Sequence, residues 1–454
     1  MKNWQEKPDL LFLFFAVPFG LLLVFLIPPL GGGDEGFHYH RIASIAFYQV
    51  FNKPVEVPSG IAAFIQSGSD FFRAGMQPPF SFSLEQWHKM AVIPLDSNAQ
   101  VTLLPDYMTV HHPLSYIPQI LVFRLGVIAG LTPLAILYAG RVAGLVCGIG
   151  LTFLAIRRVP SHKDLLCAFA LFPTMMAYRS TMDADALVNG LAFLFIASLF
   201  YEITAQGIIS FRNIIWLALL AFVLAQCKNV YLLLLLLAFA IPAERFSSFV
   251  ARMGALMLVI LPGTVLSLVW MVLMKQTYFT GIHYHTWGGD AYPDMQAAFI
   301  FHHPLGFLKI MVHTLFSTPL LPVAFLETIG DVGPGYSLPV LLSAGLCYLL
   351  IAVIAADRQF VVPYGNGVRV LSATIFIMAF VTILALLYIH WTGLEAPIIQ
   401  GFQGRYFCPL LPLLIPFIQS REKPLLPITP ASCVALFAFS GLTVTVWVIT
   451  KNYY

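Results

Sequence analysis

Long apolar runs alternate with short polar breaks along most of the chain. Several runs hold roughly 20 apolar residues, the length that an α-helix needs to cross a bilayer. The pattern predicts an all-α polytopic membrane protein with about eleven transmembrane helices. The expected spans are residues 10–30, 134–156, 164–179, 186–204, 212–227, 229–243, 254–274, 338–356, 370–391, 406–419 and 430–450.

Two long polar segments interrupt the apolar runs, at residues 31–133 and 275–337. Segments of this length are usually functional rather than simple connections. Within the first segment, residues 34–50 and 114–130 show helical patterns, and we expect both as helices at the membrane interface. In the second segment, residues 304–316 are expected to form a surface helix.

Charge fixes the expected orientation. The N-terminal residues carry Lys2 and Lys7, and cations concentrate in alternate short breaks between the spans. Short cytoplasmic loops carry an excess of Lys and Arg. The pattern therefore predicts a cytoplasmic N-terminus, with both long segments on the opposite face of a single transmembrane domain over residues 1–454.

Composition agrees with a membrane protein and excludes other classes. Hydrophobic residues make up 59% of the chain and charged residues 10%, far from the usage of soluble domains. The net charge is only +3 and no dense Lys/Arg face occurs, so nucleic-acid binding is not expected. The six cysteines lack metal-ligand spacing, which predicts neither a disulfide framework nor a zinc site.

Ionisable residues follow the first span directly. Asp34, Glu35, His38 and Arg41 come after three glycines, which are expected to let the chain turn tightly. Charged groups at a membrane are costly and are rarely there without a use. In a helix that begins near Asp34, the spacing puts Asp34, His38 and Arg41 on one face. A carboxylate there can accept a proton or bind a divalent cation. The alternative is that Asp34 caps the helix and Arg41 binds lipid headgroups.

Two pairs of polar residues occupy predicted breaks. His111 and His112 precede Pro113, where they can donate to a phosphate, bind a metal or simply lie at the interface. Asp183 and Asp185 connect two spans, and helix capping is the better explanation for one of them. Asp183 precedes its span by several residues, so it is the better functional candidate.

Two cations lie at the same predicted face. Lys228 interrupts an apolar stretch, and it either reaches the headgroups or neutralises the phosphate of a lipid-linked ligand. Arg405, followed by Tyr406, suits bidentate contact with phosphate oxygens. Gly401 and Gly404 precede this position and are expected to let the backbone approach a ligand. The alternative is that Arg405 and Tyr406 anchor the chain at the interface.

In this order, the motifs resemble the bacterial membrane-protein family known as domain of unknown function 2142, which is grouped with the GT-C superfamily of glycosyltransferases. The resemblance covers nearly the whole chain. Its motifs are Gly-Gly-Asp34-Glu35-x-x-His38-x-x-Arg41, His112-Pro113-Leu114-x-Tyr116, Ser180-x-x-Asp183, Lys228 and Gln403-Gly404-Arg405-Tyr406.

The resemblance implies a GT-C-like fold in the bacterial inner membrane and a sugar donor carried on polyprenyl phosphate. It implies that Asp34 is the catalytic or metal-binding acid of the first extracytoplasmic loop, with Glu35 beside it. It also implies that the Arg405 motif faces the donor phosphate, and that the His112-Pro113 helix packs beside the acid.

We therefore expect a glycosyltransferase that moves the sugar to a glycan or lipid-linked acceptor on the periplasmic face, surrounded by membrane lipids. Asp34 and Glu35 are the expected catalytic residues. A divalent cation, Mg²⁺ or Mn²⁺, would bind at Asp34 if one is needed. The expected substrate-binding residues are His38, Arg41, His111, His112, Asp183, Lys228, Arg405 and Tyr406.

Two other functions fit the same residues. A transporter or flippase of a lipid-linked sugar would use the cations to hold the headgroup. Transporters often show related halves and polar residues near the bilayer midplane, whereas these polar residues gather at one face. That difference favours the enzyme. A non-catalytic scaffold requires only that the acid be dispensable.

Overall fold

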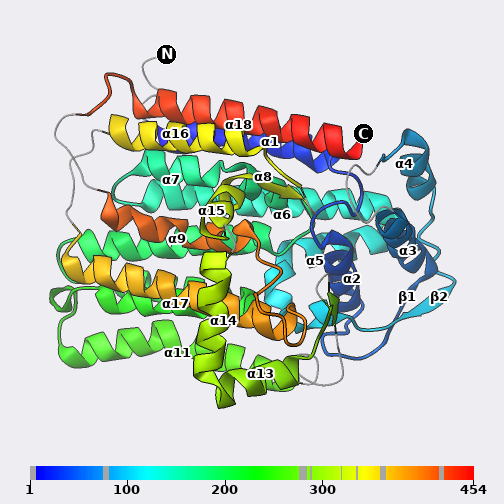
Figure 1. Cartoon of the computed structure of the whole chain (residues 1–454), viewed down its shortest axis with the longest axis horizontal. Coiled ribbons are helices and arrows are strands. Elements are labelled where there is room, and N and C mark those ends of the chain that lie inside the picture. Colours follow the sequence, from blue (N-terminus) through cyan, green and yellow to red (C-terminus); the bar gives the residue numbers. More distant parts are fainter. Residues whose placement is uncertain are drawn as a thin grey trace.

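Helices dominate the computed structural model, and the long ones run side by side in one bundle (Figure 1). Among the described residues, six helices are long and apolar enough to cross a membrane. They are α1 (Pro8–Leu26), α6 (Pro133–Arg158), α9 (Asp185–Thr204), α11 (Phe249–Leu273), α17 (Asn366–His390) and α18 (Pro430–Tyr453). The structure describes residues 7–74, 81–275, 284–286, 289–317, 320–333, 336–357, 364–418 and 424–454.

Four shorter apolar segments occupy other predicted spans. Two are α-helices of 17 residues, α10 (Phe211–Cys227) and α16 (Val340–Ala356). The other two are 3₁₀-helices, η3 (Asn229–Ala240) and η5 (Gly404–Phe417). A 3₁₀-helix rises about 2.0 Å per residue, so the 14 residues of η5 extend roughly 28 Å, close to the thickness of a bilayer core. The number of eleven spans stays a prediction.

The predicted span at residues 164–179 is not one continuous helix. It consists of α7 (Lys163–Ala170) and α8 (Pro173–Arg179), which are separated by a break. Pro173 has no N–H group to donate to the preceding turn, and its ring disfavours helical geometry in the residue before it. The prediction of a single helix was therefore wrong, because hydrophobicity alone does not register this break.

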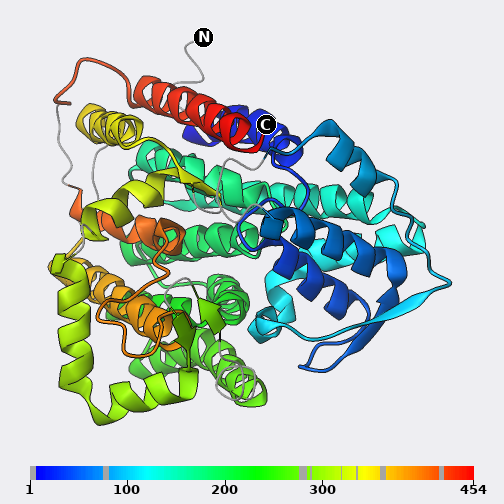
Figure 2. The ribbon, with the colours of Figure 1, turned by 45° about the vertical axis from the view of Figure 1, so that its right-hand side comes forward.

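The first long polar segment forms a compact group of short elements at one end of the bundle (Figures 1 and 2). The helices predicted at residues 34–50 and 114–130 are present as α2 and as η2 followed by α5. Strands β1 and β2 pair antiparallel, with Val55 opposite Leu103. The elements are α2 (Glu35–Ala46), β1 (Val55–Pro58), α3 (Ser59–Ala74), α4 (Leu84–Ala91), β2 (Gln100–Leu103), η1 (Tyr107–Val110), η2 (Pro113–Tyr116) and α5 (Ile117–Ile128).

The second long segment contains the helix predicted at residues 304–316, which is α14. It runs across the direction of the long helices (Figure 1). Parts of this segment, at 276–283, 287–288, 318–319 and 334–335, lie outside the described residues. Its elements are β3 (Tyr284–Thr286), β4 (Gly289–Ala291), α13 (Pro293–His302), α14 (Pro304–Ser317), α15 (Leu320–Gly330), β5 (Asp331–Gly333) and β6 (Tyr336–Ser337), and the short η4 (Ala243–Arg245) lies earlier in the chain.

Helix α9 lies at the centre of the bundle, with 17 of its 20 residues buried. It packs most extensively against α6. Glycines permit this close approach, because a Cβ on Gly148 would lie 2.6 Å from the carbonyl oxygen of Ala186. Small residues serve the same purpose between membrane helices in general. This packing fixes the start of α9, and with it the turn that carries Asp183 and Asp185.

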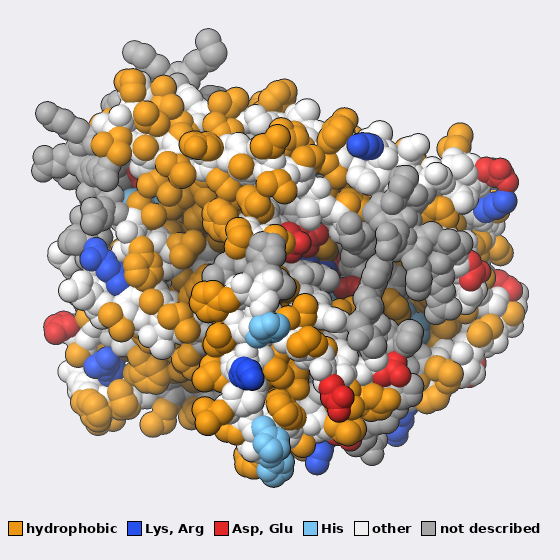
Figure 3. Space-filling model, viewed as in Figure 1, with side chains coloured by type: hydrophobic (Ala, Val, Ile, Leu, Met, Phe, Trp, Pro, Cys, Tyr) orange, Lys and Arg blue, Asp and Glu red, His pale blue; other side chains and the backbone are white. Residues whose placement is uncertain are grey.

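The surface reflects the same division. On the face shown in Figure 3, hydrophobic side chains dominate over the long helices. Charged side chains are more frequent at the right, over the first long segment (Figure 3). This distribution suits a helix bundle surrounded by lipid, with a polar group of elements at one end.

Candidate functional site

The turn after α1 brings Asp34 to the end of the bundle in a strained conformation. Leu30 and Asp34 both have positive φ, at 61° and 60°. These two residues make the turn, which corrects the expectation that the glycines would make it. Gly32 and Gly33 instead allow close packing, because a Cβ on Gly32 would lie 2.5 Å from Thr181. A left-handed backbone costs a non-glycine residue roughly 1–2 kcal/mol, and such strain clusters at functional sites.

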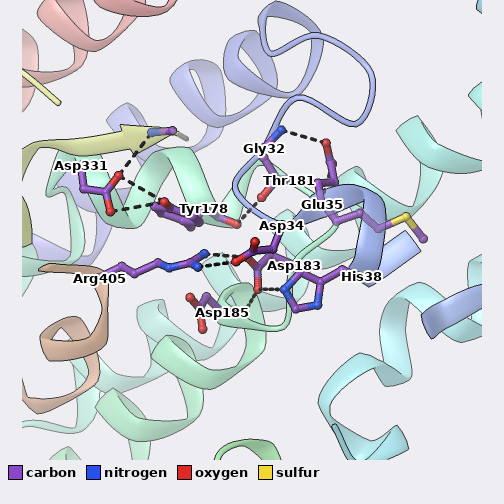
Figure 4. Close-up of polar contacts among 12 residues, drawn as sticks. Gly32, Asp34, Glu35, His38, Tyr178, Thr181, Asp183, Asp185, Asp331 and Arg405 are labelled. Atoms are coloured by element: carbon purple, nitrogen blue, oxygen red, sulfur yellow. Dashed lines mark hydrogen bonds and ion pairs between the residues drawn. The ribbon is translucent and has the colours of Figure 1, made fainter. Parts of the chain in front are cut away.

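Asp34 occupies the N-cap position of α2, but its carboxylate makes no capping hydrogen bond. It accepts a hydrogen bond from Nη2 of Arg405 at 2.6 Å, across 371 positions of sequence. Nη1 of Arg405 contacts the carboxylate of Asp183 at 3.4 Å (Figure 4). Arg405 therefore joins the two carboxylates, and its guanidinium lies 4.6 Å above the ring of Tyr178. Capping, the alternative explanation for Asp34, does not account for its contacts.

Asp183 also binds His38, which extends the network into α2 and η2. Nε2 of His38 lies 3.2 Å from Asp183, and Nδ1 lies 2.6 Å from the hydroxyl of Tyr116. Burial by itself would lower the pKa of His38, but the Asp183 carboxylate outweighs it and raises the pKa above the usual value. Burial would raise the pKa of Asp183, yet His38, Arg405 and Lys228 lower it. Both shifts favour the charged forms of the pair, an imidazolium for His38 and a carboxylate for Asp183.

Lys228 reaches the same place from the junction of α10 and η3. Its ammonium group forms an ion pair with Asp185 and lies 5.9 Å from the ring centre of Tyr406. Asp185 opens α9, and its N–H donates to the carboxylate of Asp183 at 3.0 Å. One turn thus holds both aspartates. Asp183 pairs with Arg405, and Asp185 pairs with Lys228.

A cavity of about 330 Å³ lies beside this network. Its lining includes Asp34, His38, Lys228, Arg405 and Tyr406. Asp183 and Asp185 are not among the residues that line it, whereas the cationic side chains paired with them are. The structure therefore brings Asp34, Lys228 and Arg405, which are far apart in sequence, into one pocket.

His111 and His112 line the cavity as well. Burial lowers the pKa of His111 well below its usual value, and the neighbouring cations lower it further. Burial also lowers the pKa of His112, to about 4. Both are neutral imidazoles at physiological pH. Nδ1 of His112 accepts from the N–H of Leu114 at 3.2 Å, and its ring packs against Trp270 with centroids 4.7 Å apart.

Besides Asp183, two expected site residues do not line the cavity. Glu35 is fully buried, and both of its carboxylate oxygens bind Arg141, at 2.7 and 2.6 Å. Arg41 is 1% exposed and donates to the carbonyl oxygens of His111 and Val50 at 2.9 Å each. The expectation that Glu35 shares the catalytic role does not fit this geometry. The expectation that Arg41 contacts a ligand does not fit this geometry either. The side chains of Glu35 and Arg41 both bind other parts of the protein and hold the first long segment in place.

The glycines around Arg405 serve packing. Gly401 has a φ of +76°, and a Cβ there would lie 1.8 Å from the ring of Trp391. A Cβ on Gly404 would lie 2.1 Å from the backbone nitrogen of Thr328 in α15. These contacts correct the expectation that the glycines open the backbone to a ligand. They set the position from which Arg405 reaches Asp34.

The sequence profile of a family described as predicted membrane proteins, DUF2142, matches residues 17–414. The chain belongs to this family. The matched region contains Asp34, Asp183, Lys228 and Arg405, so the whole network lies within the DUF2142 region. No curated protein and no solved structure matches the chain.

The donor set of this DUF2142 protein does not fit a divalent cation. In the part of the chain that the structure describes, no group of three or more His, Cys, Asp or Glu side chains is arranged to hold a metal ion. Arg405 occupies the carboxylates of Asp34 and Asp183, and the third aspartate is paired with Lys228. The expected Mg²⁺ or Mn²⁺ therefore has no role in the chemistry proposed below.

Sequence reasoning missed three residues that support the network. The ring of Tyr178 packs against the guanidinium of Arg405, and the Tyr178 hydroxyl donates to Asp331 at 3.2 Å (Figure 4). Burial raises the pKa of Asp331 to about 7. Arg141 binds Glu35 from within α6. Tyr178 and Asp331 had no motif to mark them. The position of Arg141 in the middle of the apolar α6 run was the one signal available for it, because charged residues are rare inside spans.

Proposed function

We propose that this membrane protein is a GT-C-type glycosyltransferase of the bacterial inner membrane. It moves a sugar from a polyprenyl-phosphate donor to a hydroxyl of a glycan or lipid-linked acceptor. In this proposal the cavity faces the periplasm and the N-terminus lies in the cytoplasm. The order of motifs shared with the family, and the resemblance of that family to GT-C enzymes, support the assignment.

One observation carries the proposal: cationic side chains and a carboxylate converge on a mainly apolar cavity. Lys228, Arg405 and His38 face it, together with Asp34. Asp183 and Asp185, which also pair with these side chains, do not line the cavity. A phosphate in the cavity meets positive charge held in place by buried partners, and such preorganised charge is more effective than charge in water.

The proposed reaction is a single displacement. The oxygen of the acceptor hydroxyl bonds to the anomeric carbon, and the bond from that carbon to the phosphate oxygen breaks. The hydroxyl proton passes to the carboxylate of Asp34, and the electron pair of the broken bond leaves with polyprenyl phosphate. A single displacement inverts the anomeric carbon.

The side chains have separate roles in this reaction. Asp34 is the general base, an effect typically worth about 10²–10⁴ in rate. Its side chain is 31% exposed, so it can contact an acceptor, while Arg405 orients it at 2.6 Å. Lys228 and Arg405 stabilise the charge that develops on the leaving phosphate.

A reconstituted assay tests the proposal. Purified protein in lipid vesicles receives a polyprenyl-phosphate donor with a labelled sugar, and a membrane extract supplies acceptors. We expect the label to leave the polyprenyl phosphate and to appear in the acceptor fraction. Movement of the intact labelled lipid across the vesicle, with no transfer, would instead identify a transporter. Label that stays on the donor with neither transfer nor movement would equally contradict the enzyme.

A further inference from the structure

The cavity has one wall that the reaction at Asp34 does not explain. On α17, the residues Ile383, Leu386, Leu387 and His390 line it. They recur at positions i, i+3, i+4 and i+7, which place them in one stripe along the helix. The stripe begins two turns before the C-terminal end of α17 and is apolar except at His390. An apolar wall of this kind suits a hydrocarbon rather than a sugar.

Helix α11 provides the opposite wall, and η3 provides the floor. Ser267 and Trp270 of α11 and Val230 of η3 line the cavity. Both α11 and α17 pack against η3. Lys228 immediately precedes η3, so the floor leads from the cationic group along an apolar 3₁₀-helix.

The two flanks of α17 differ. One flank is covered by α13 and α14, where the rings of Phe299 and Phe307 lie 6.0 and 5.2 Å from the ring of Tyr388. Elsewhere along the helix, Leu386 lines the cavity and is 38% exposed, whereas Tyr388 is 3% exposed. Helix α17 is therefore uncovered at Leu386 and covered at Tyr388.

We propose that the hydrocarbon chain of the donor leaves the cavity sideways, between α11 and α17, over η3. This inference rests on the proposed function, since it places the donor phosphate at Lys228 and Arg405. The occupant is a polyprenyl chain because its anionic head meets the cations while its tail meets an apolar wall. Both helices also carry exposed apolar side chains that suit contact with hydrocarbon, such as Val269 of α11 and Val381 of α17, at 47% and 39%.

A bulky residue at the opening tests this route. Leu386→Trp narrows the opening, whereas Ile377→Trp adds the same bulk at a 60% exposed position of α17 that does not line the cavity. Each variant is assayed with the same sugar on a long polyprenyl phosphate and on a short isoprenyl phosphate. For Leu386→Trp we expect the ratio of long-chain to short-chain kcat/KM to fall about tenfold, which corresponds to the contacts of roughly two methylene groups. Ile377→Trp leaves the ratio at the wild-type value. An unchanged ratio in Leu386→Trp overturns the route.

A second measurement separates this inference from the proposed function, because it requires no turnover. Long-chain polyprenyl phosphate with a photoreactive group in its tail is bound to the wild-type protein and cross-linked. We expect adducts on α11 and α17 near Trp270 and Leu386. Adducts found only on other helices would overturn the route even in an active enzyme. Adducts at the expected place, in a protein that transfers no sugar, would retain the route while the enzyme assignment fails.

Discussion

Asp34 and Glu35 are neighbours in sequence and each pairs with a distant arginine, yet the two ion pairs differ in their surroundings. Glu35 and Arg141 are both 0% exposed, and Arg141 also donates to backbone carbonyl oxygens such as that of Ile27 at 2.7 Å. Asp34 is 31% exposed and meets Arg405 at the cavity. The first pair is enclosed by protein on every side, whereas the second leaves a carboxylate available to a ligand.

The enclosed pair of Glu35 and Arg141 fixes the position of the open pair of Asp34 and Arg405. Glu35 accepts a hydrogen bond from the backbone N–H of Met182 at 2.8 Å, one residue before Asp183. It therefore ties the start of α2 to the turn before α9, and Asp34 and Asp183 are held within reach of one guanidinium. One of two adjacent ion pairs thus has a face open to the cavity, and the enclosed pair beside it fixes the geometry.

Breaking the enclosed pair should have the largest effect. Glu35→Ala leaves the guanidinium of Arg141 buried without a counterion, which typically costs about 3–5 kcal/mol. We expect loss of folded protein, measured as the amount in the membrane fraction and the melting temperature in detergent. The double variant Glu35→Leu/Arg141→Met removes both charges and should recover part of the loss. Wild-type stability in Glu35→Ala would show that the two pairs do not differ as described.

Weakening the open pair should affect activity more than stability. Arg405→Lys keeps the charge but loses the two-pronged contact with Asp34 and Asp183 and the stacking on Tyr178, since an ammonium group offers neither. Loss of one charge-assisted hydrogen bond is worth about 1.5–3 kcal/mol, so donor affinity should fall roughly tenfold or more. Donor binding is measured by titration with polyprenyl phosphate.

The matched control for this substitution is Arg158→Lys. Arg158 also stacks on a tyrosine, at 3.8 Å from the ring of Tyr201, and binds Glu202 at 3.0 Å, but it does not line the cavity. We expect its donor affinity to equal that of the wild type. Equal losses of donor affinity in Arg158→Lys and Arg405→Lys would show that both losses come from a general loss of stability.

The smallest expected effect concerns pH. The pKa of His38 is raised, so the stabilisation from its pair with Asp183 is complete below about pH 6.5 and is lost as pH rises through the raised value. The pKa of Asp183 is lowered, so its contribution is present above about pH 3.9 and is lost only as pH falls through the lowered value. The melting temperature of the wild-type protein should therefore be roughly 1–3 °C lower at a pH above the raised pKa of His38 than at a pH below it. His38→Gln should show no such alkaline loss, and an identical pH profile in both proteins would exclude His38 as its source.

Hydrophobicity predicted much of the fold, because the positions and lengths of the apolar runs in the sequence indicate the long helices directly. It failed at Pro173, where a local backbone constraint divides a uniformly apolar run into α7 and α8. It also gave no sign that η3 and η5 are 3₁₀-helices. In both cases the deciding property is backbone geometry, which apolar length does not carry.

The sequence indicated most of the residues of the site but not their relations. Alternation of inside and outside loops placed Asp34, Asp183, Lys228 and Arg405 at one end of the bundle. The same reasoning treated Asp34 and Glu35 alike, because two adjacent acids are distinguished only by the turn that orients them. The positive φ of Asp34 directs one to the cavity and the other into the protein. Contacts across hundreds of residues, such as that of Arg405 with Asp34, depend on packing that no local motif specifies.

The central claim is that Asp34 performs the chemistry while the cations hold the donor. The most direct test is the single-turnover rate of sugar transfer by Asp34→Asn at saturating polyprenyl-phosphate sugar, compared with the wild type. Asparagine keeps the size of the side chain and removes its basicity, so we predict a rate at least about 100-fold lower, with donor still bound. A rate within about threefold of the wild type, below the range of general-base catalysis, would contradict the account.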